Sequence, residues 1–304
     1  MKKPNAADFL DSFREGAPEA PEVVDEPLFC ETCDRTCEKF ADAALRGEAV
    51  SVGYGDRVII EPMDVAVPAG EITSIIGPNG CGKSTLLKAL SRTMPLRGGA
   101  VYLDGRAIAE MPTAEVARRM ALLPQSPQAP AGLTVGELVA LGRYPHQKGF
   151  RRLTDDDKRI IDWALSITHL GDFAARPIDA LSGGQRQRAW IAMALAQDTG
   201  LILLDEPTTY LDMAHQLEVL ELLQTLNRDE GKTIALVIHE LNLAARFSDW
   251  MIALKAGAIR GAGTPAEVMT PALLREVFGL DALIAPDPWT GRPSLVSYRL
   301  AGEE

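Results

Sequence analysis

The apolar and polar positions of this chain form two kinds of short runs, which differ in what interrupts them. Runs of β type occupy residues 50–54, 57–61 and 63–67, and glycine or proline separates them. This pattern is typical of an antiparallel sheet. The run 201–204 is apolar throughout and 233–238 nearly so, as in parallel strands that are covered on both faces. We therefore expect an α/β fold with an antiparallel part on its N-terminal side.

Residues typical of helix starts and turns predict the elements in the rest of the chain. Thr134 and Glu137 have the spacing of a capping box, and Thr154 precedes three aspartates, which are favourable at a helix N-terminus. These signals predict a block of helices at about residues 125–190. An Asp-Gly pair after the β-type run 99–103 predicts a hairpin turn.

A glycine-rich segment lies between the apolar run 71–76 and a helix-forming stretch. Its residues are Gly77, Pro78, Asn79, Gly80, Cys81, Gly82, Lys83, Ser84 and Thr85. In such strand, loop and helix units, backbone N–H groups and the helix N-terminus converge on a phosphate, and the glycines are sterically required. Lys83 would reach the β- and γ-phosphates, and the Ser84 hydroxyl would complete the coordination of Mg²⁺. The acidic strand end described next disfavours an ordinary glycine-rich turn.

Two carboxylates follow the apolar run 201–204 directly. Asp205 would bind Mg²⁺, directly or through water, and Glu206 would polarise the attacking water, because the carboxyl ends of parallel strands lie beside the phosphates. His239 follows the run 233–238 at the same edge, where its imidazole would contact the γ-phosphate or the water. Taken alone, an Asp-Glu pair is usually a helix cap, and a histidine at a strand end is usually a hydrogen-bonded structural residue.

Three further positions are candidates for nucleotide contacts. Tyr54 precedes the phosphate loop, where its ring could stack on adenine, although a tyrosine that packs on the sheet fits the spacing equally well. Gln125 opens a loop after the apolar run 121–123. A capping serine, two glycines and a capping glutamine predict a second exposed anion site at Ser182, Gly183, Gly184 and Gln185.

Composition and charge exclude several classes of function. The chain has 304 residues, 46% hydrophobic and 24% charged, which suffices for one large domain or two small ones. Its formal net charge of -11 gives no overall electrostatic reason to bind nucleic acid or anionic lipid. Its longest apolar runs are far shorter than the roughly 20 residues of a membrane span, and a signal-peptide core is absent. We expect a cytoplasmic chain that binds no nucleic acid.

Residues 1–47 are rich in Pro, Ala, Glu and Asp and have no sustained period, which predicts a disordered leader. It carries Cys30, Cys33 and Cys37, and the fourth cysteine, Cys81, lies in the phosphate loop. This distribution is not a disulfide framework and fits a reducing compartment. The three leader thiols could bind zinc or an iron–sulfur cluster if a fourth ligand came from elsewhere, but free thiols in a flexible leader are the favoured interpretation.

In their order along the chain, these motifs resemble those of the nucleotide-binding subunit of ATP-binding cassette (ABC) transporters, over about residues 48–304. The phosphate loop resembles the Walker A motif, residues 181–185 the signature motif and 201–207 the Walker B motif. Tyr54 is similar to the A-loop aromatic residue, Gln125 to the Q-loop glutamine, Glu206 to the catalytic glutamate, Asp212 to the D-loop aspartate and His239 to the switch histidine. The resemblance implies a P-loop NTPase fold with a RecA-like core, an antiparallel β subdomain and a helical signature subdomain.

The resemblance also implies how the residues act on ATP. Glu206, His239 and Gln125 would be catalytic, and Mg²⁺ would be held by Ser84, Gln125 and Asp205. The chain would work as a head-to-tail homodimer, in which each signature helix caps the ATP held by the partner. The ATP-binding residues would be Tyr54, the whole loop from Gly77 to Thr85, Asp205, Ser182, Gly183, Gly184, Gln185 and Asp212.

Within this superfamily, residues 132–135, 142–146, 210–216 and 277–280 are similar to the ATPases of iron–siderophore importers. Glu240 stands where that family more often has Asp, which keeps the charge. The resemblance implies an ATPase that energises ferric siderophore uptake from the cytoplasmic face of the membrane, with two transmembrane permease subunits and, indirectly, a substrate-binding protein. A haem or cobalamin importer is the alternative. A soluble ABC protein without transport function is less favoured, because the chain has one cassette and a compact insertion.

Overall fold

The computed structural model describes residues 40, 42–55, 57–147, 152–209 and 211–302. The expected leader, with Cys30, Cys33 and Cys37, lies outside the described residues except for its last part, and Tyr210 also lies outside them. Within the described ranges, every helix is too short or too polar to span a membrane.

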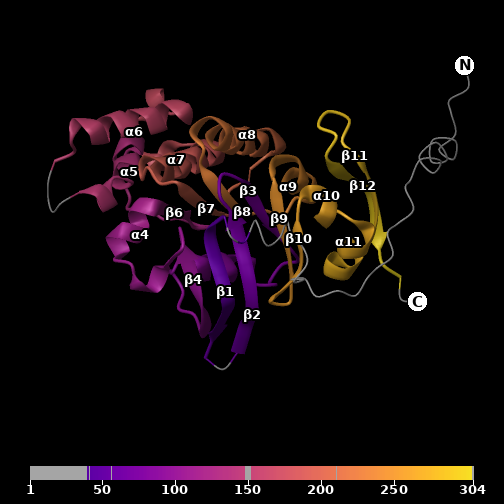
Figure 1. Ribbon diagram of the computed structural model, residues 1–304. Coiled ribbons are helices and arrows are strands. Elements are labelled where there is room, and N and C mark those ends of the chain that lie inside the picture. The colour runs from indigo at the N-terminus through magenta and orange to yellow at the C-terminus, as the bar shows by residue number, and fades with distance from the viewer. Residues whose placement is uncertain (1–39, 41, 56, 148–151, 210, 303–304) are drawn as a thin grey trace, which may run out of the picture. The chain divides into compact units, whose positions relative to one another are not determined.

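The central sheet contains six strands in the order β10-β9-β3-β8-β7-β6 (Figure 1). These are β3 (Ile72–Ile76), β6 (Met120–Leu123), β7 (Leu201–Asp205), β8 (Thr233–Val237), β9 (Trp250–Lys255) and β10 (Ala258–Gly263). All neighbours pair in parallel except β10, which runs antiparallel to β9. Every residue of β3, β7 and β8 is buried, as their apolar runs predict.

Nine α-helices occur in the described part of the chain. They are α3 (Lys83–Leu90), α4 (Thr113–Arg119), α5 (Val135–Leu141), α6 (Asp155–Ile167), α7 (Gly183–Ala196), α8 (Met213–Glu230), α9 (Leu241–Phe247), α10 (Pro265–Val268) and α11 (Pro271–Phe278). Capping boxes begin α5, α6 and α7, as the sequence predicts for the helical block. Short 3₁₀ helices cover Ile108–Glu110, Tyr144–His146, Gly171–Phe173 and Ile178–Ala180.

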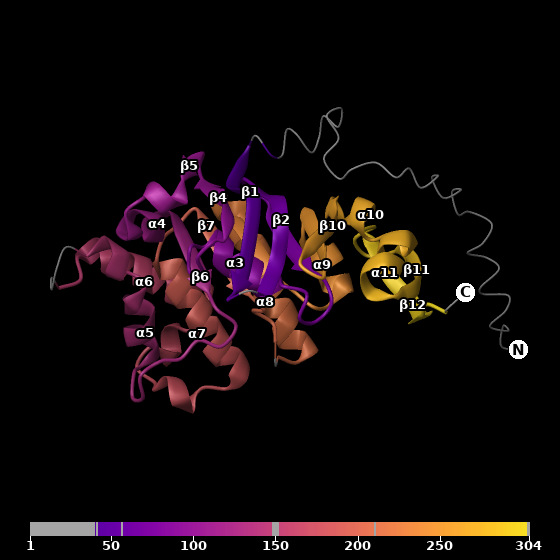
Figure 2. The same ribbon diagram turned by 90° about the horizontal axis from the view of Figure 1, so that it is seen from below.

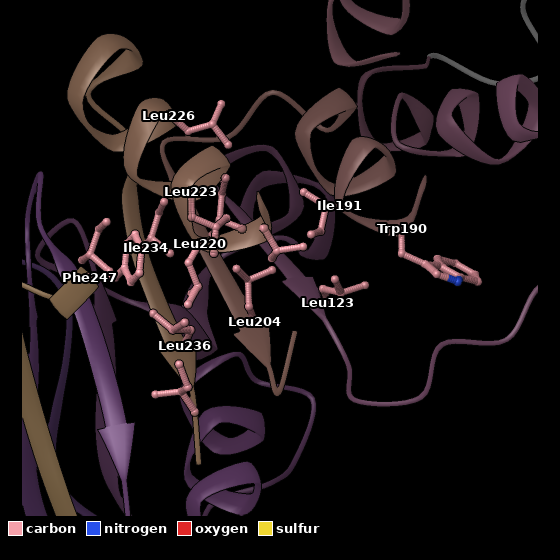
Figure 3. Packing of buried hydrophobic residues seen from close by; sticks show 14 of the residues in the cluster. Leu123, Trp190, Ile191, Leu204, Leu220, Leu223, Leu226, Ile234, Leu236 and Phe247 are labelled. Atoms are coloured by element: carbon pink, nitrogen blue, oxygen red, sulfur yellow. The ribbon is translucent and has the colours of Figure 1, made fainter. Parts of the chain in front are cut away.

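Alternate residues of the central strands enter two different hydrophobic cores. Leu204 and Leu236 lie in one core, together with side chains of α7 and α8 such as Ile191 and Leu220 (Figure 3). Leu203 of β7, whose side chain alternates with Leu204, lies in the other core, which includes apolar residues of α3. Burial on both faces fixes the register of the strands and therefore the position of the residues at their ends.

A second sheet is antiparallel, as expected, and its strand order is β2-β1-β4-β5. Its strands are β1 (Ala43–Tyr54), β2 (Arg57–Pro68), β4 (Gly98–Leu103) and β5 (Arg106–Ala107). Residues of β1, β2 and β4 share a core with α3, and Figure 2 shows these strands close to that helix. Asp104 and Gly105 both have positive φ, 49° and 75°, which matches the hairpin turn predicted between β4 and β5.

Two expectations about this sheet were wrong. Residues 57–61 and 63–67 form one strand, because Pro62 lies at a shift of register between the pairs Val50–Met63 and Val52–Ile60. A bulge of this kind tolerates a proline. Proline has no backbone N–H, and at the bulge the hydrogen bonds between the two strands are already interrupted. Strand β1 also begins at Ala43, inside the range 1–47 expected for the leader.

The C-terminal part forms a separate two-stranded sheet of β11 (Leu280–Pro286) and β12 (Pro293–Leu300). Two hydrogen bonds join this hairpin to α9: Asn242 Nδ2 donates to the Leu295 carbonyl, and the Leu295 N–H donates to Asn242 Oδ1. Arg292 also donates to the carbonyl of Ala245. The hairpin is therefore attached to the helix that follows His239.

Candidate active site

The loop between β3 and α3 has the backbone conformation that an anion cradle requires. Gly77, Gly80 and Gly82 have φ values of 150°, 75° and 107°, in the region that side chains rarely adopt. A Cβ atom at Gly77 would lie 2.2 Å from the carbonyl oxygen of Leu254. No side chain caps the N-terminus of α3, so its first N–H groups are available to an anion.

The Lys83 side chain extends back along this loop. Its ammonium group donates to the carbonyl oxygens of Gly77 at 2.8 Å and Pro78 at 2.9 Å, and the residue is only 5% exposed. An ammonium has three N–H donors, so one remains for a phosphate oxygen. The loop carbonyls therefore hold the positive charge of Lys83 beside the loop backbone.

Ser84 and Asp205 meet beside the loop. The Ser84 hydroxyl donates to Asp205 Oδ1 at 2.7 Å, although the two residues are far apart in sequence. Burial raises the pKa of Asp205, and the hydrogen bond from Ser84 and the charges of Lys88 and Lys83 only partly oppose this. A buried carboxylate and a hydroxyl in contact are the oxygen donors that Mg²⁺ takes in phosphate sites, so these two residues fit that ion.

The Glu206 carboxylate receives three side-chain partners. Gln125 Nε2 donates to Oε2 at 2.6 Å and the Thr209 hydroxyl donates to the same oxygen at 3.0 Å. His239 Nε2 lies 2.7 Å from Oε1. Burial acts to raise the pKa of Glu206, but the partners, with His239 contributing most, outweigh it and hold the pKa below its ordinary value. Gln125 and His239, the other two residues predicted to be catalytic, thus both contact Glu206.

Lys83, Ser84, Glu206 and His239 line a shared cavity of about 270 Å³. Its lining joins the antiparallel sheet, the phosphate loop and the ends of β7 and β8: Tyr54, Ile59, Asn79, Gly80, Gly82, Lys83, Ser84, Thr85, Glu206 and His239. Tyr54 is 62% exposed, so its ring is available for stacking and is not packed within the sheet. Cys81 of the loop is buried, and burial raises the pKa of its thiol.

The predicted signature residues form a second group, which does not line this cavity. Ser182 is the N-cap of α7 and makes a reciprocal capping box with Gln185. A Cβ atom at Gly184 would lie 2.6 Å from the His215 ring, so glycine allows α7 to approach α8 closely. Asp212 caps α8 and accepts hydrogen bonds from both the N–H and Nδ1 of His215. His215 therefore lies next to both Gly184 of the signature motif and the D-loop residue Asp212.

Comparisons with known proteins agree with this geometry. A family model described as ABC transporter matches residues 60–209. The iron(3+)-hydroxamate import ATP-binding protein FhuC of Bacillus subtilis (strain 168) is 59% identical over 261 residues, which are 86% of this chain and 97% of that protein. The chain belongs to the ABC transporter ATP-binding proteins.

Two further matches extend the family assignment. The ferric enterobactin transport ATP-binding protein FepC of Escherichia coli (strain K12) is 50% identical and covers 84% of this chain and 94% of its own. The dimeric post-hydrolysis structure of the ATP-binding cassette MJ0796, bound to ADP and Pi, has a TM-score of 0.64 and 29% identity and covers 72% of this chain and 98% of its own. These matches confirm that this ABC ATPase has the expected P-loop NTPase fold.

Sequence reasoning missed two residues of the ABC ATPase site. Ile59 lines the cavity next to the loop and gives it an apolar wall. Thr209 donates to Glu206, and its only sequence signal is its position three residues after that glutamate. This spacing predicts a contact only when the backbone conformation of Glu206 is known. That residue has a positive φ of 55°, which the sequence does not indicate.

Proposed function

We propose that this ABC ATPase hydrolyses ATP in the cavity between Tyr54 and His239 to energise the uptake of ferric siderophores. One observation carries the hydrolytic part of this proposal. The phosphate loop with Lys83 and the carboxylate of Glu206 line the same cavity, so the groups suited to hold a γ-phosphate lie next to a base.

Each group in the cavity has a task that follows from its chemistry. Tyr54 stacks on the adenine ring, and the N–H groups of the loop with Lys83 hold the phosphates. Glu206 is charged at neutral pH, since its pKa lies below an already acidic ordinary value, and its carboxylate can accept a proton from the attacking water. His239, in contact with Glu206, orients that carboxylate and is within the same cavity as the phosphates.

Ser84, Asp205 and Gln125 are the residues that would hold Mg²⁺. When bound, this ion would neutralise the charge that develops on the transferred phosphoryl group. Asp205 supports this assignment, because a carboxylate with a pKa raised by burial is stabilised by a further positive charge nearby. Gln125 contacts Glu206 through its amide nitrogen, so its carbonyl oxygen remains to act as a ligand.

A second copy of the chain would complete the site. The helix start at Ser182 has the N–H groups of an anion site but does not line the cavity of its own chain. In a head-to-tail dimer it would cap the γ-phosphate held by the partner, with Asp212 beside it. The similar cassette MJ0796 was solved as a dimer with ADP and Pi.

The substrate and the membrane partners are proposed from the relatives. FhuC is named for iron(3+)-hydroxamate import and FepC for ferric enterobactin transport, and both cover more than 80% of this chain. We therefore assign a ferric siderophore as cargo and two transmembrane permease subunits, on whose cytoplasmic side the ATPase sits. Tyr144, on the 3₁₀ helix Tyr144–His146, is 77% exposed and is suited to contact them.

Transport and ATP binding in the parent and in Lys83→Ala test this proposal. Lys83→Ala should weaken ATP binding, because it removes the ammonium from the loop, and should abolish siderophore-dependent growth under iron limitation. Lys232→Ala, a change of the same kind far from the loop in sequence, is the control and should support growth. If a deletion strain took up every tested ferric siderophore normally but lost haem or cobalamin uptake, the siderophore assignment would be wrong while the ATPase assignment would stand.

A further inference from the structure

Thr209, which lies between the Walker B run and Asp212, contacts the Glu206 carboxylate. Its hydroxyl donates to Oε2 at 3.0 Å. The side chain of Glu206 is 10% exposed in this environment, so few water molecules compete for that oxygen. A hydrogen bond to a charged group in a shielded place is stronger than one between neutral groups.

The contact is built into the turn that follows β7. Glu206 adopts a φ of 55°, which is uncommon for a residue with a side chain and turns the backbone sharply after Asp205. The Thr209 N–H donates to the Glu206 carbonyl at 3.3 Å and closes the turn. The intervening Pro207 and Thr208 are buried, which holds the turn in place. Thr209 is therefore held in the same turn as Glu206.

The other two partners of the carboxylate come from different segments. Gln125 lies in the loop after β6, and His239 lies after β8. Under the proposed function both also contact the nucleotide or its ion, so the position of each depends on more than its contact with Glu206. Thr209 is the partner whose contact does not depend on how those two segments move.

We propose that Thr209 is a positioning residue, which fixes Oε2 of Glu206 so that Oε1 is directed to the attacking water. This inference rests on the proposed role of Glu206 as the base. The hydroxyl acts by restricting the rotamer of the carboxylate, and it neither touches the nucleotide cavity nor transfers a proton. Loss of the hydroxyl should therefore slow the chemical step and leave nucleotide binding as it is.

Steady-state ATPase kinetics of the full-length chain separate this role from a structural one. Thr209→Val keeps the shape and removes the donor, and it should lower kcat about tenfold or more, the factor set by one hydrogen bond to a charged group, with an unchanged KM for ATP. Thr209→Ser retains the donor and should restore most of kcat. Thr208→Val is the matched control, since this neighbouring threonine is not among the side chains that contact Glu206.

The Glu206→Gln background shows whether Thr209 acts through the carboxylate. In that background Thr209→Val should have little further effect on the residual rate, because the group it positions is no longer a base. A parental kcat in Thr209→Val, or an equal loss in Thr208→Val, would overturn the positioning role while the ATPase assignment stood. A parent that binds ATP without hydrolysing it would overturn both.

Discussion

At the scale of single residues, the two neighbouring carboxylates of the site have opposite electrostatic environments. Burial raises the pKa of Asp205, whereas burial at Glu206 is outweighed by hydrogen bonds from His239, Thr209 and Gln125, which lower the pKa of Glu206. Because β-strand neighbours point to opposite faces, and the positive φ of Glu206 turns it further, each carboxylate meets a different set of partners. Different environments are what allow two adjacent acids to have different tasks.

A substitution at Glu206 tests the task given to the base. Glu206→Gln keeps the size and the acceptor oxygen but cannot take up a proton, so kcat should fall by a factor of about 100 or more while ATP binding persists. Radiolabelled ATP hydrolysis and equilibrium nucleotide binding measure the two quantities. Glu230→Gln, at the exposed end of α8, is the control. Hydrolysis by Glu206→Gln at close to the parental rate would contradict the role.

The sequence predicts the conformation of the candidate site well where that conformation depends on local geometry. The loop from Gly77 to Thr85 and the cap at Ser182 are defined by neighbours a few positions away, so their conformation follows from the residue types. Thr209 could not be predicted, because its contact depends on the positive φ at Glu206. The contact between Gly184 and His215 depends on the packing of two helices, which periodicity does not specify.

At the scale of elements, a buried ion pair ties the helical block together. Arg143 follows α5, Asp157 lies in the first turn of α6, and Nε of the arginine is 2.8 Å from Oδ1 of the aspartate. Arg143 also donates to the carbonyl of Ala196 at the end of α7. One guanidinium thus connects three helices. The sequence predicts the cap Thr154 that precedes α6 but gives no sign of this pair, since its residues meet only after the helices have packed.

The pH dependence of stability should reveal this pair. Burial acts to raise the pKa of Asp157, but hydrogen bonds from Arg143 and Thr154 outweigh it and lower the pKa from 3.8 to about 2. A carboxylate with a lowered folded-state pKa stabilises the fold above its unfolded pKa and loses this effect as the pH falls toward the folded value. The stabilisation, about 2 kcal/mol, should therefore be present at neutral pH and be lost between about pH 4 and pH 2.

Denaturant unfolding at several pH values compares the parent with Asp157→Asn. The difference in the free energy of unfolding should be at least about 2 kcal/mol at pH 7 and should shrink as the pH falls below 4. Asp155→Asn is the control, because its side chain is 97% exposed and its partner Lys158 is also exposed. A difference between parent and Asp157→Asn that stays constant down to pH 2 would exclude the proposed pair as its cause.

At the scale of the whole molecule, the proposed function requires two anion sites, and only one of them lines the cavity of its own chain. The phosphate loop with Lys83 lines the cavity, and the helix start at Ser182 does not. Each site is complete in its local structure, since Lys83 is fixed by the loop and Ser182 by its capping box. Under the proposed function, a two-fold arrangement of two chains would satisfy both sites at once, and ATP would become part of the interface.

Gly183 offers a way to test this arrangement without disturbing the fold. It is the first residue of α7, is exposed, and has no atom within 4 Å of the place where a Cβ would lie. A glutamate there would be compatible with the helix dipole but would place a negative charge where the partner's γ-phosphate is expected.

In the Glu206→Gln background, ATP should therefore convert the parent and Gly183→Ala into dimers, whereas Gly183→Glu should remain monomeric. Sedimentation velocity with and without ATP measures the change, and equilibrium binding verifies that Gly183→Glu still takes up nucleotide. Dimers of Gly183→Glu in ATP would show that this helix start does not face the partner's phosphates.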